Sequence, residues 1–310
     1  METLHISLLG ELQIQNGKPI NIQLEALRAQ ELLCYLLLHR DQLHDREKLA
    51  TLMWAEAPAT RSKQYLRQTL WQVQSKLNPV TVQEPLLVVE HHRIGVNPRA
   101  SFWLDVALFE ETFAALEKTS ARELTPTQME LLRSTVQLYH GDLLAGWYQD
   151  WCIYARDRYQ NMYLSMLDKL LSYCELHHAY EAGLRYGWQI LQYDRAREGT
   201  HRRLMRLHYQ AGNRTAAIHQ YELCVTTLAE ELDVGPAHST TALYEQICAD
   251  CVVLSAQCEA APADHPDQAP LQSVPILQQL EQMQLALSQL QAQVAALMRY
   301  AKQNDATVAD

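Results

Sequence analysis

The 310-residue sequence has few glycines and no long hydrophobic run. Its 10 glycines are too few for a loop-rich or mainly β fold. The longest apolar run, LLCYLLL, has about seven residues, whereas a membrane-spanning helix needs roughly 20. The first ten residues, METLHISLLG, lack the basic segment and long apolar core of a signal peptide. We therefore expect a cytoplasmic chain with no membrane contact, whose seven cysteines are reduced thiols rather than a disulfide framework.

The motifs of common enzymes are also missing. The sequence has no G-x-x-x-x-G-K-[ST] phosphate loop, and no serine or cysteine nucleophile motif accompanies its histidines. We therefore predict no enzyme, no catalytic residues and no bound cofactor. Four histidines would be candidates for a general base only if the missing nucleophile motif were ignored: His177, His178, His201 and His208.

One cysteine pattern has the spacing of a metal site. The sequence C-x2-C-x6-C-x6-H could supply four zinc ligands, namely Cys248, Cys251, Cys258 and His265. The first two cysteines fall within a helical apolar pattern, however, and small buried thiols are the commoner outcome. The pair His91 and His92 has no third ligand nearby. No metal site is therefore predicted.

The net charge of −10 is distributed unevenly along the chain. Residues 1–105 hold 11 of the 26 basic and 11 of the 36 acidic residues, so the remaining 15 basic and 25 acidic residues carry the whole net charge. Between residues 57 and 80 there are four basic residues and no acidic one. Because phosphate contacts are local, a basic element on an acidic body is compatible with DNA binding.

The first hundred residues combine strand and helix patterns. Residues 4–22 alternate apolar and polar side chains around Asn16–Gly17, a pair typical of a β-hairpin turn. Asp45 is a candidate N-cap for the second of three helices. The predicted order after the hairpin is helix 24–40, helix 45–54, a loop over 55–60, helix 61–78 and two short strands within 86–98. This order predicts an α+β winged helix-turn-helix with an extra N-terminal sheet.

The third helix, 61–78, has an apolar face opposite a polar face that lacks acidic residues. The apolar stripe is formed by Leu66, Leu70, Val73 and Leu77. The opposite side presents Arg61, Gln64, Gln68, Trp71, Gln72 and Ser75. A solvated helix usually mixes both charge signs, so this composition favours a helix that reads DNA.

The chemistry of that polar face suggests a role for each side chain. Glutamine amides can pair with adenine edges in the major groove, and basic side chains can hold phosphates or a guanine. We therefore predict DNA contacts from Arg61, Lys63, Gln64, Arg67, Gln68 and Gln72. Trp71 projects outward, but tryptophan packs more often than not, so we expect it to pack against the second helix or the wing.

From about residue 103 to residue 255 the pattern predicts helices only. The candidates cover 104–118, 125–139, 152–177, 179–193, 198–212, 214–232 and 238–251. Ala182 and Tyr186 recur 35 residues later as Ala217 and Tyr221, the packing pattern of a tetratricopeptide-type array. One group of aromatic residues fits helix packing better than a ligand box, so we expect it in the core: Trp147, Tyr148, Trp151, Tyr154 and Tyr159.

The C-terminal part differs in composition from the rest. Residues 256–275 contain four prolines and little that could form a core, which is typical of a linker. Beyond it, apolar residues alternate at spacings of four and three: Ile276, Leu280, Met283, Leu287, Leu290, Val294 and Leu297. This 3.5-residue period predicts a short coiled-coil helix. The predicted organisation is a DNA-binding domain over 1–99, an all-α domain over 100–255, a linker over 256–275 and a coiled-coil helix over 276–303.

Several linked motifs give the chain a family resemblance. The N-terminal ones are LLGELQI (8–14), LLCYLLLHR (32–40), REKLATLMW (46–54) and YLRQTLWQVQSKL (65–77). The helical ones are LYHGDLLAGWYQDW (138–151), REGTHRRLMRLHYQAGNRTAAIHQY (197–221), LAEELDVGP (228–236) and TTALYEQI (240–247). In order and spacing they resemble the SARP-type bacterial transcriptional activators, in which an OmpR-type winged helix precedes a bacterial transcriptional activation domain of tetratricopeptide type.

The resemblance implies a function and partners. It implies an activator without ATPase activity, which binds double-stranded DNA as a homodimer and contacts RNA polymerase, with the loop 55–60 as the candidate polymerase contact. It also implies that Arg93, near the wing tip, touches the minor groove or the DNA backbone. The chain departs from the family where helix 61–78 ends, because QVQSKL has one basic residue, Lys76, instead of an arginine-rich run.

Two other functions remain open at this point. The first is a helical-repeat protein-interaction module whose winged helix no longer reads DNA, which the missing arginine run and the acidic body would fit. The second is an enzyme or a metal-dependent redox sensor built on Cys248, Cys251 and Cys258. The salt dependence of binding separates the first from a DNA-binding activator. Affinity for DNA falls steeply with salt because binding releases counterions, whereas a protein docking surface has no reason to show this slope.

Overall fold

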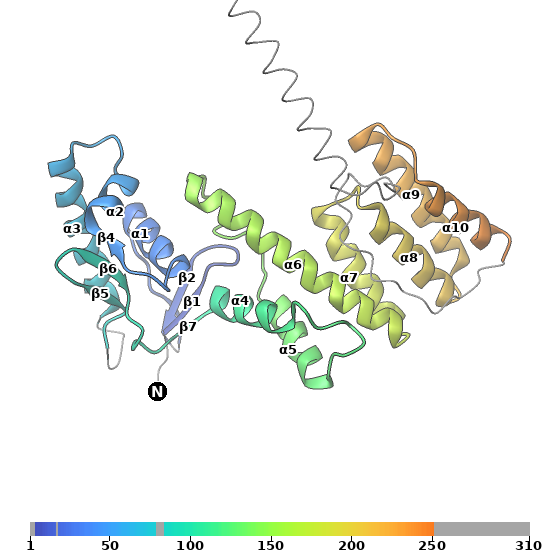
Figure 1. Cartoon of the computed structure of the whole chain (residues 1–310), viewed down its shortest axis with the longest axis horizontal. Coiled ribbons are helices and arrows are strands. Elements are labelled where there is room, and N and C mark those ends of the chain that lie inside the picture. The colour runs from blue at the N-terminus through green and yellow to red at the C-terminus, as the bar shows by residue number, and fades with distance from the viewer. Residues whose placement is uncertain (1–3, 17, 79–83, 251–310) are drawn as a thin grey trace, which may run out of the picture. The chain divides into compact units, whose positions relative to one another are not determined.

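The computed structural model describes residues 4–16, 18–78 and 84–250. These residues form two small β-sheets and ten helices (Figure 1). The predicted linker, 256–275, and the predicted coiled-coil helix, 276–303, lie outside the described residues. Among the described residues, no helix is both long and apolar enough to cross a bilayer.

The first sheet has the strand order β3-β2-β1-β7. Its strands are β1 (Leu4–Ser7), β2 (Gln13–Asn16), β3 (Lys18–Asn21) and β7 (Phe102–Leu104). The hairpin predicted around Asn16 corresponds to β2 and β3, and β1 adds a further antiparallel strand. Strand β7 runs parallel to β1 and pairs Leu104 with Ile6. This strand was not predicted, because its sequence adjoins a helical pattern and its partner lies almost 100 residues away.

The second sheet and three helices form the predicted winged helix. In chain order the elements are α1 (Leu27–Leu38), β4 (His44–Asp45), α2 (Arg46–Met53), α3 (Ala59–Leu77), β5 (Leu87–Val89) and β6 (Arg93–Val96). The strand order is β4-β6-β5, all antiparallel. Asp45 is the N-cap of α2, as predicted, and accepts hydrogen bonds from the backbone N–H of Glu47 and Lys48. These bonds lower the pKa of the Asp45 carboxyl, because they stabilise its charged form.

Seven helices follow, so the predicted fold class is confirmed for the described part of the chain. They are α4 (Asp105–Leu116), α5 (Pro126–Val136), α6 (Asp150–Leu176), α7 (Tyr180–Tyr193), α8 (Glu198–Gln210), α9 (Arg214–Leu232) and α10 (His238–Cys248). Each helix from α4 to α10 packs against the next one along the chain. This nearest-neighbour packing is typical of a helical repeat array.

Small residues allow α7 to approach its neighbours closely. A Cβ at Gly187 would come within 2.4 Å of the Leu204 side chain on α8, and one at Gly183 within 3.0 Å of Leu207. In α9 the equivalent small residue is Ala217, which is fully buried as predicted, whereas Ala182 of α7 is half-buried. Close helix packing therefore depends on glycines in α7 and on an alanine in α9.

The N-terminal sheet and the helical part are joined by hydrogen bonds between two of the sequence motifs. The backbone N–H of Leu144 donates to the carbonyl of Leu8 at 2.9 Å, and that of Gly10 donates to the carbonyl of Asp142 at 3.2 Å. The buried Asp105 carboxylate accepts from the backbone N–H of Leu8 and Leu9 at 2.7 and 2.8 Å. One continuous hydrophobic core extends from the first sheet through α1 and α3 into α4–α8.

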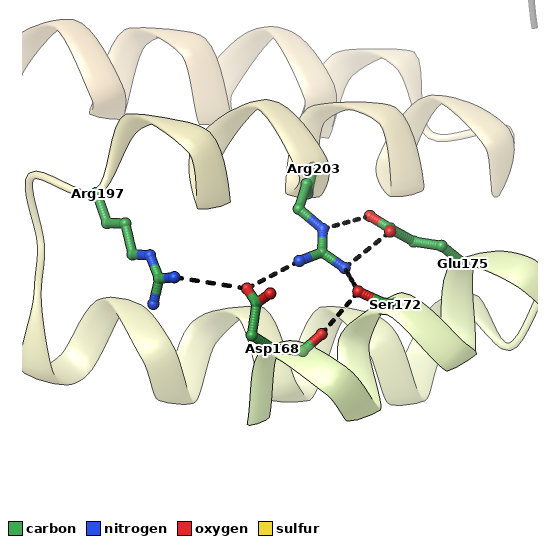
Figure 2. A network of polar contacts seen from close by, with 5 residues as sticks. All are labelled: Asp168, Ser172, Glu175, Arg197 and Arg203. Atoms are coloured by element: carbon green, nitrogen blue, oxygen red, sulfur yellow. Dashed lines mark hydrogen bonds and ion pairs between the residues drawn. The ribbon is translucent and has the colours of Figure 1, made fainter. Parts of the chain in front are cut away.

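An arginine of α8 holds this helix against α6 (Figure 2). The guanidinium of Arg203 donates two hydrogen bonds to the Glu175 carboxylate, both at 2.8 Å, and one to Asp168 at 2.9 Å. It also donates to the Ser172 hydroxyl. Arg197, the residue before α8, lies 3.7 Å from the same Asp168 carboxylate. The Arg203 side chain is 17% exposed, so these bonds lie largely out of water.

Candidate nucleic-acid interface

Helix α3 is fixed by its apolar face. Leu66, Leu70, Val73 and Leu77 are all buried, as predicted, and the helix packs against α1 and α2. It begins at Ala59, two residues before the predicted start, because the backbone N–H of Arg61 and Ser62 donate to the carbonyl of Pro58. The loop between α2 and α3 is correspondingly shorter than predicted. The outer face of α3 is thus presented by a helix anchored along its whole length.

The predicted DNA-contacting residues lie on the accessible part of α3. Five of the six have exposed side chains and Gln72 is half-buried; the exposed ones are Arg61, Lys63, Gln64, Arg67 and Gln68. The outer surface of α3 has no acidic residue of its own between Ala59 and Leu77. The arrangement can therefore offer amide donors and acceptors flanked by positive charge.

The basic residues of α3 differ in their partners. In the described part of the chain neither Arg61 nor Arg67 forms an ion pair. Lys63 contacts the Glu47 carboxylate of α2 at 2.5 Å, and both side chains are at least half exposed. Lys76 lies 3.9 Å from Glu25. Exposed pairs of this kind contribute about 0–1 kcal/mol, so a DNA phosphate could displace either carboxylate from its lysine.

The wing is formed by β5, β6 and the turn between them. The backbone N–H of Glu90 donates to the carbonyl of Arg93 and closes this turn. The carbonyl of His92 accepts from the backbone N–H of Arg46, the first residue of α2, which ties the wing to the helices. The side chains of His91, His92 and Arg93 are exposed. Arg93 is therefore accessible at the position that the sequence suggested.

The expectation that Trp71 packs inside the molecule is wrong. Its side chain is 68% exposed, although it belongs to a helix with a well-buried apolar face. The indole that does lie by the second helix is that of Trp54, which is half-buried and whose ring centroid is 6.2 Å from that of Tyr65. The helical spacing projects Trp71 outward, and this geometry decides its exposure more than the general preference of tryptophan for burial does.

The aromatic group around the start of α6 is only partly in the core. Tyr159 is buried, and Trp147 and Trp151 pack against the core with their rings edge to face. Tyr148 and Tyr154 are 82% and 80% exposed, so the prediction is wrong for these two residues. Tyr148 lies two residues before α6 and Tyr154 is the fifth residue of that helix, and both side chains are open to solvent.

Four buried cysteines, one in α1 and three in the helical part, and the buried His201 fit structural roles. Cys34, Cys152, Cys174 and Cys224 are buried, and burial raises the pKa of each thiol. His201 is buried and hydrogen-bonded on both ring nitrogens, to the carbonyl of Arg195 and to the Gln220 amide. Three members of the suggested zinc pattern, Cys251, Cys258 and His265, lie outside the described residues.

Comparisons with known proteins agree with the helical part and with the fold as a whole. Residues 104–248 match the family described as the bacterial transcriptional activator domain. The transcriptional regulatory protein MoaR1 of Mycobacterium tuberculosis, and likewise that of Mycobacterium bovis, is 26% identical over an alignment of 261 residues that covers 79% of each chain. The solved structure of Mycobacterium tuberculosis EmbR in complex with a low-affinity phosphopeptide shares the fold with a TM-score of 0.65, at 17% identity over 82% of this chain and 67% of EmbR.

A winged helix joined to a bacterial transcriptional activator domain defines a class of transcription regulators rather than of enzymes. Residues 104–248 match the bacterial transcriptional activator domain, and the chain is similar to transcriptional regulators, in agreement with the resemblance to SARP-type activators that its motifs indicated.

Proposed function

We propose that this chain is a sequence-specific DNA-binding activator that places α3 in the major groove and the β5–β6 wing alongside it. The outer face of α3 carries this proposal, because it combines exposed amides, two arginines without ion pairs in the described part of the chain, and no carboxylate. Such a face suits a groove lined by phosphates and base edges.

Each predicted side chain has a role in this arrangement. Gln64, Gln68 and Gln72 are placed to read base edges, with adenine as the preferred base because its N6 and N7 match an amide. The basic residues Arg61, Lys63, Arg67 and Arg93 would position the protein on the phosphates. Since the chromosome of a bacterium lies in the cytoplasm, we place the working protein there.

Pairing of two protomers would strengthen binding to adjacent half-sites. With one winged helix bound, the second binds at an effective concentration set by the connection between them, which can raise the overall affinity by about 10²–10⁴. That gain would offset the small number of basic residues on α3. The apolar heptads over 276–303 and the helical domain are the proposed pairing elements, with 1–99, 100–255 and 256–275 as DNA-binding domain, helical domain and linker.

We also propose that the connection between α2 and α3 contacts RNA polymerase. In the structure it is short and exposed, with Glu56 and Pro58 accessible to solvent. It lies at the N-terminal end of α3, so it would stay accessible while the middle of that helix occupies the groove.

Binding to a selected DNA site tests the proposal. A pool of random duplexes would be enriched by binding to the full chain, and the selected duplex and a scrambled one would be titrated by fluorescence anisotropy at several salt concentrations. We expect at least tenfold tighter binding to the selected duplex, and a double variant Arg67→Ala, Gln68→Ala should lose that margin. The matched control is Arg206→Ala, Gln246→Ala, which removes the same two residue types from exposed positions on α8 and α10.

The alternative is a protein-interaction module whose winged helix no longer reads DNA. It predicts equal, weak binding to both duplexes and no difference between the two double variants. A shallow salt dependence would accompany that result, because few counterions would be released.

A further inference from the structure

Trp71 is the large apolar side chain on the outer face of α3. It follows Gln64 by seven residues and Gln68 by three, so all three side chains lie along one stripe of the helix. The indole is 68% exposed, and in the described part of the chain it makes no ring contact. Leaving so large an apolar surface in water is unfavourable, and such surfaces commonly mark binding sites.

Neither α3 nor its neighbours account for this exposure. The apolar face that holds the helix in place is complete without Trp71, since Leu66, Leu70 and Val73 are already buried. Arg67 lies one turn before Trp71 and Ser75 one turn after it, so the indole stands within the polar stripe and not at its edge. Whatever covers the polar stripe must therefore also accommodate an apolar plane.

We propose that Trp71 is a base-reading residue whose indole packs against the C5-methyl group of a thymine in the major groove. This inference rests on the proposed function, because it takes the DNA-facing side of α3 as given. The thymine methyl is the apolar group that base pairs present in the major groove, and only A·T pairs carry it. With Gln64 and Gln68 suited to adenine on the same stripe, the half-site contains neighbouring A·T pairs under the middle of α3.

A probe that lacks a single methyl group tests this contact directly. Deoxyuridine pairs like thymidine but has no C5-methyl, so each thymine of the selected duplex would be replaced in turn. Burial of one methyl is worth about 0.8 kcal/mol, which corresponds to about a fourfold change in Kd. The wild-type chain should lose about fourfold in affinity at one or two of the thymines and little at the others.

Variants of Trp71 complete the experiment. Trp71→Ala should bind the selected duplex more weakly and should no longer distinguish thymine from uracil at those positions, while its salt slope stays that of the wild type because no charge is removed. Trp71→Phe keeps an apolar plane and should retain part of the discrimination. Circular dichroism of each variant checks that α3 remains folded.

The outcomes separate this inference from the proposed function. If the wild-type chain prefers the selected duplex but binds every uracil probe equally well, the proposed function stands and the role of Trp71 is overturned. The same holds if Trp71→Ala retains the uracil effect of the wild type. If the wild-type chain shows no preference for any selected duplex, the proposed function fails, and the role of Trp71 in reading thymine is overturned with it.

Discussion

The arginines around the start of α8 and those on α3 and the wing differ in what they contact. In α8 and the segment leading into it, four arginines are paired with acidic side chains: Arg195 with Glu231, Arg197 with Asp168, Arg202 with Glu198, and Arg203 with both Asp168 and Glu175. In the described part of the winged helix, Arg61, Arg67 and Arg93 form no such pair. Paired arginines hold helices together, whereas arginines left to solvent remain available to an external anion.

This difference explains how an acidic chain can include the surface that we propose for DNA. The excess of acidic over basic residues lies after residue 105, where arginines of the repeats are paired with acidic side chains. The outer face of α3 keeps its charge because no carboxylate of the same helix competes for it. Net charge therefore says less about the partner than the local pairing of each basic group.

Removal of the Arg203 side chain should have the largest effect of the changes that test this difference between the arginines. Arg203→Ala would leave Glu175 and Asp168 without their shared partner between α6 and α8, and should lower the free energy of unfolding by about 3 kcal/mol. Urea denaturation followed by circular dichroism measures this loss. Arg206→Ala, an exposed change on the same helix, should stay within about 0.5 kcal/mol of the wild type. Equal effects of the two variants would show that the Arg203 network does not stabilise the repeats.

The converse change removes the arginines of α3. The double variant Arg61→Ala, Arg67→Ala should keep its stability but flatten the dependence of log Kd on log salt by about 1.8, since each lost phosphate contact removes about 0.9. Anisotropy titrations between about 50 and 200 mM salt measure the slope. An unchanged slope would mean that these arginines do not contact phosphates, even if binding to DNA remained specific.

Much of the fold could be predicted because its signals are local. The helices α4–α10 were all expected from apolar periodicity, and Asp45 from its position before α2. Strand β7 could not be predicted in this way, because its three residues become a strand through parallel pairing with β1. The bonds from Leu8 and Leu9 to Asp105 are equally non-local, so no local pattern indicates this junction.

The candidate site was predicted in part. The outward side of α3 follows from helical geometry, and the exposed Arg61, Gln64 and Gln68 lie where the spacing put them. The predictions for Trp71 and Tyr154 are wrong because they rest on the general preference of aromatic residues for burial and not on the direction in which each side chain projects from its helix. Whether an aromatic side chain is covered depends on distant elements, which periodicity does not reveal.

The repeats also contain a buried neutral group whose protonation should weaken them. Burial lowers the pKa of His201 below its usual value, because the charged ring would lose its hydration; the bonds to Arg195 and Gln220 and the nearby carboxylates of Glu198 and Asp194 act in the opposite direction. The unfolded chain then binds the proton more readily than the folded chain. The contribution of His201 to stability is complete above pH of about 6.5 and is lost as the pH falls towards the lower folded pKa.

Urea denaturation at pH 7.5, 6.5 and 5.5 tests this effect. His201→Gln should be less stable than the wild type at pH 7.5 but should lose less stability on acidification, because its amide does not titrate. Comparison of the two slopes cancels the contributions of other histidines, such as His44 and His208, whose pKa values are also lowered by burial. Parallel slopes would rule out His201 as the source of the pH dependence.

The smallest effect concerns a basic residue of α3 that has an acidic partner and yet stays exposed. Lys63 contacts Glu47, yet both side chains are well exposed, so a double-mutant cycle with Lys63→Ala and Glu47→Ala should give a coupling energy of about 0.5 kcal/mol. Glu47→Ala alone should tighten DNA binding slightly, because it releases Lys63 and removes a negative charge near the phosphates. A coupling of about 2 kcal/mol, with no gain in DNA affinity, would place Lys63 with the arginines of the repeats, whose charge serves the fold rather than a partner.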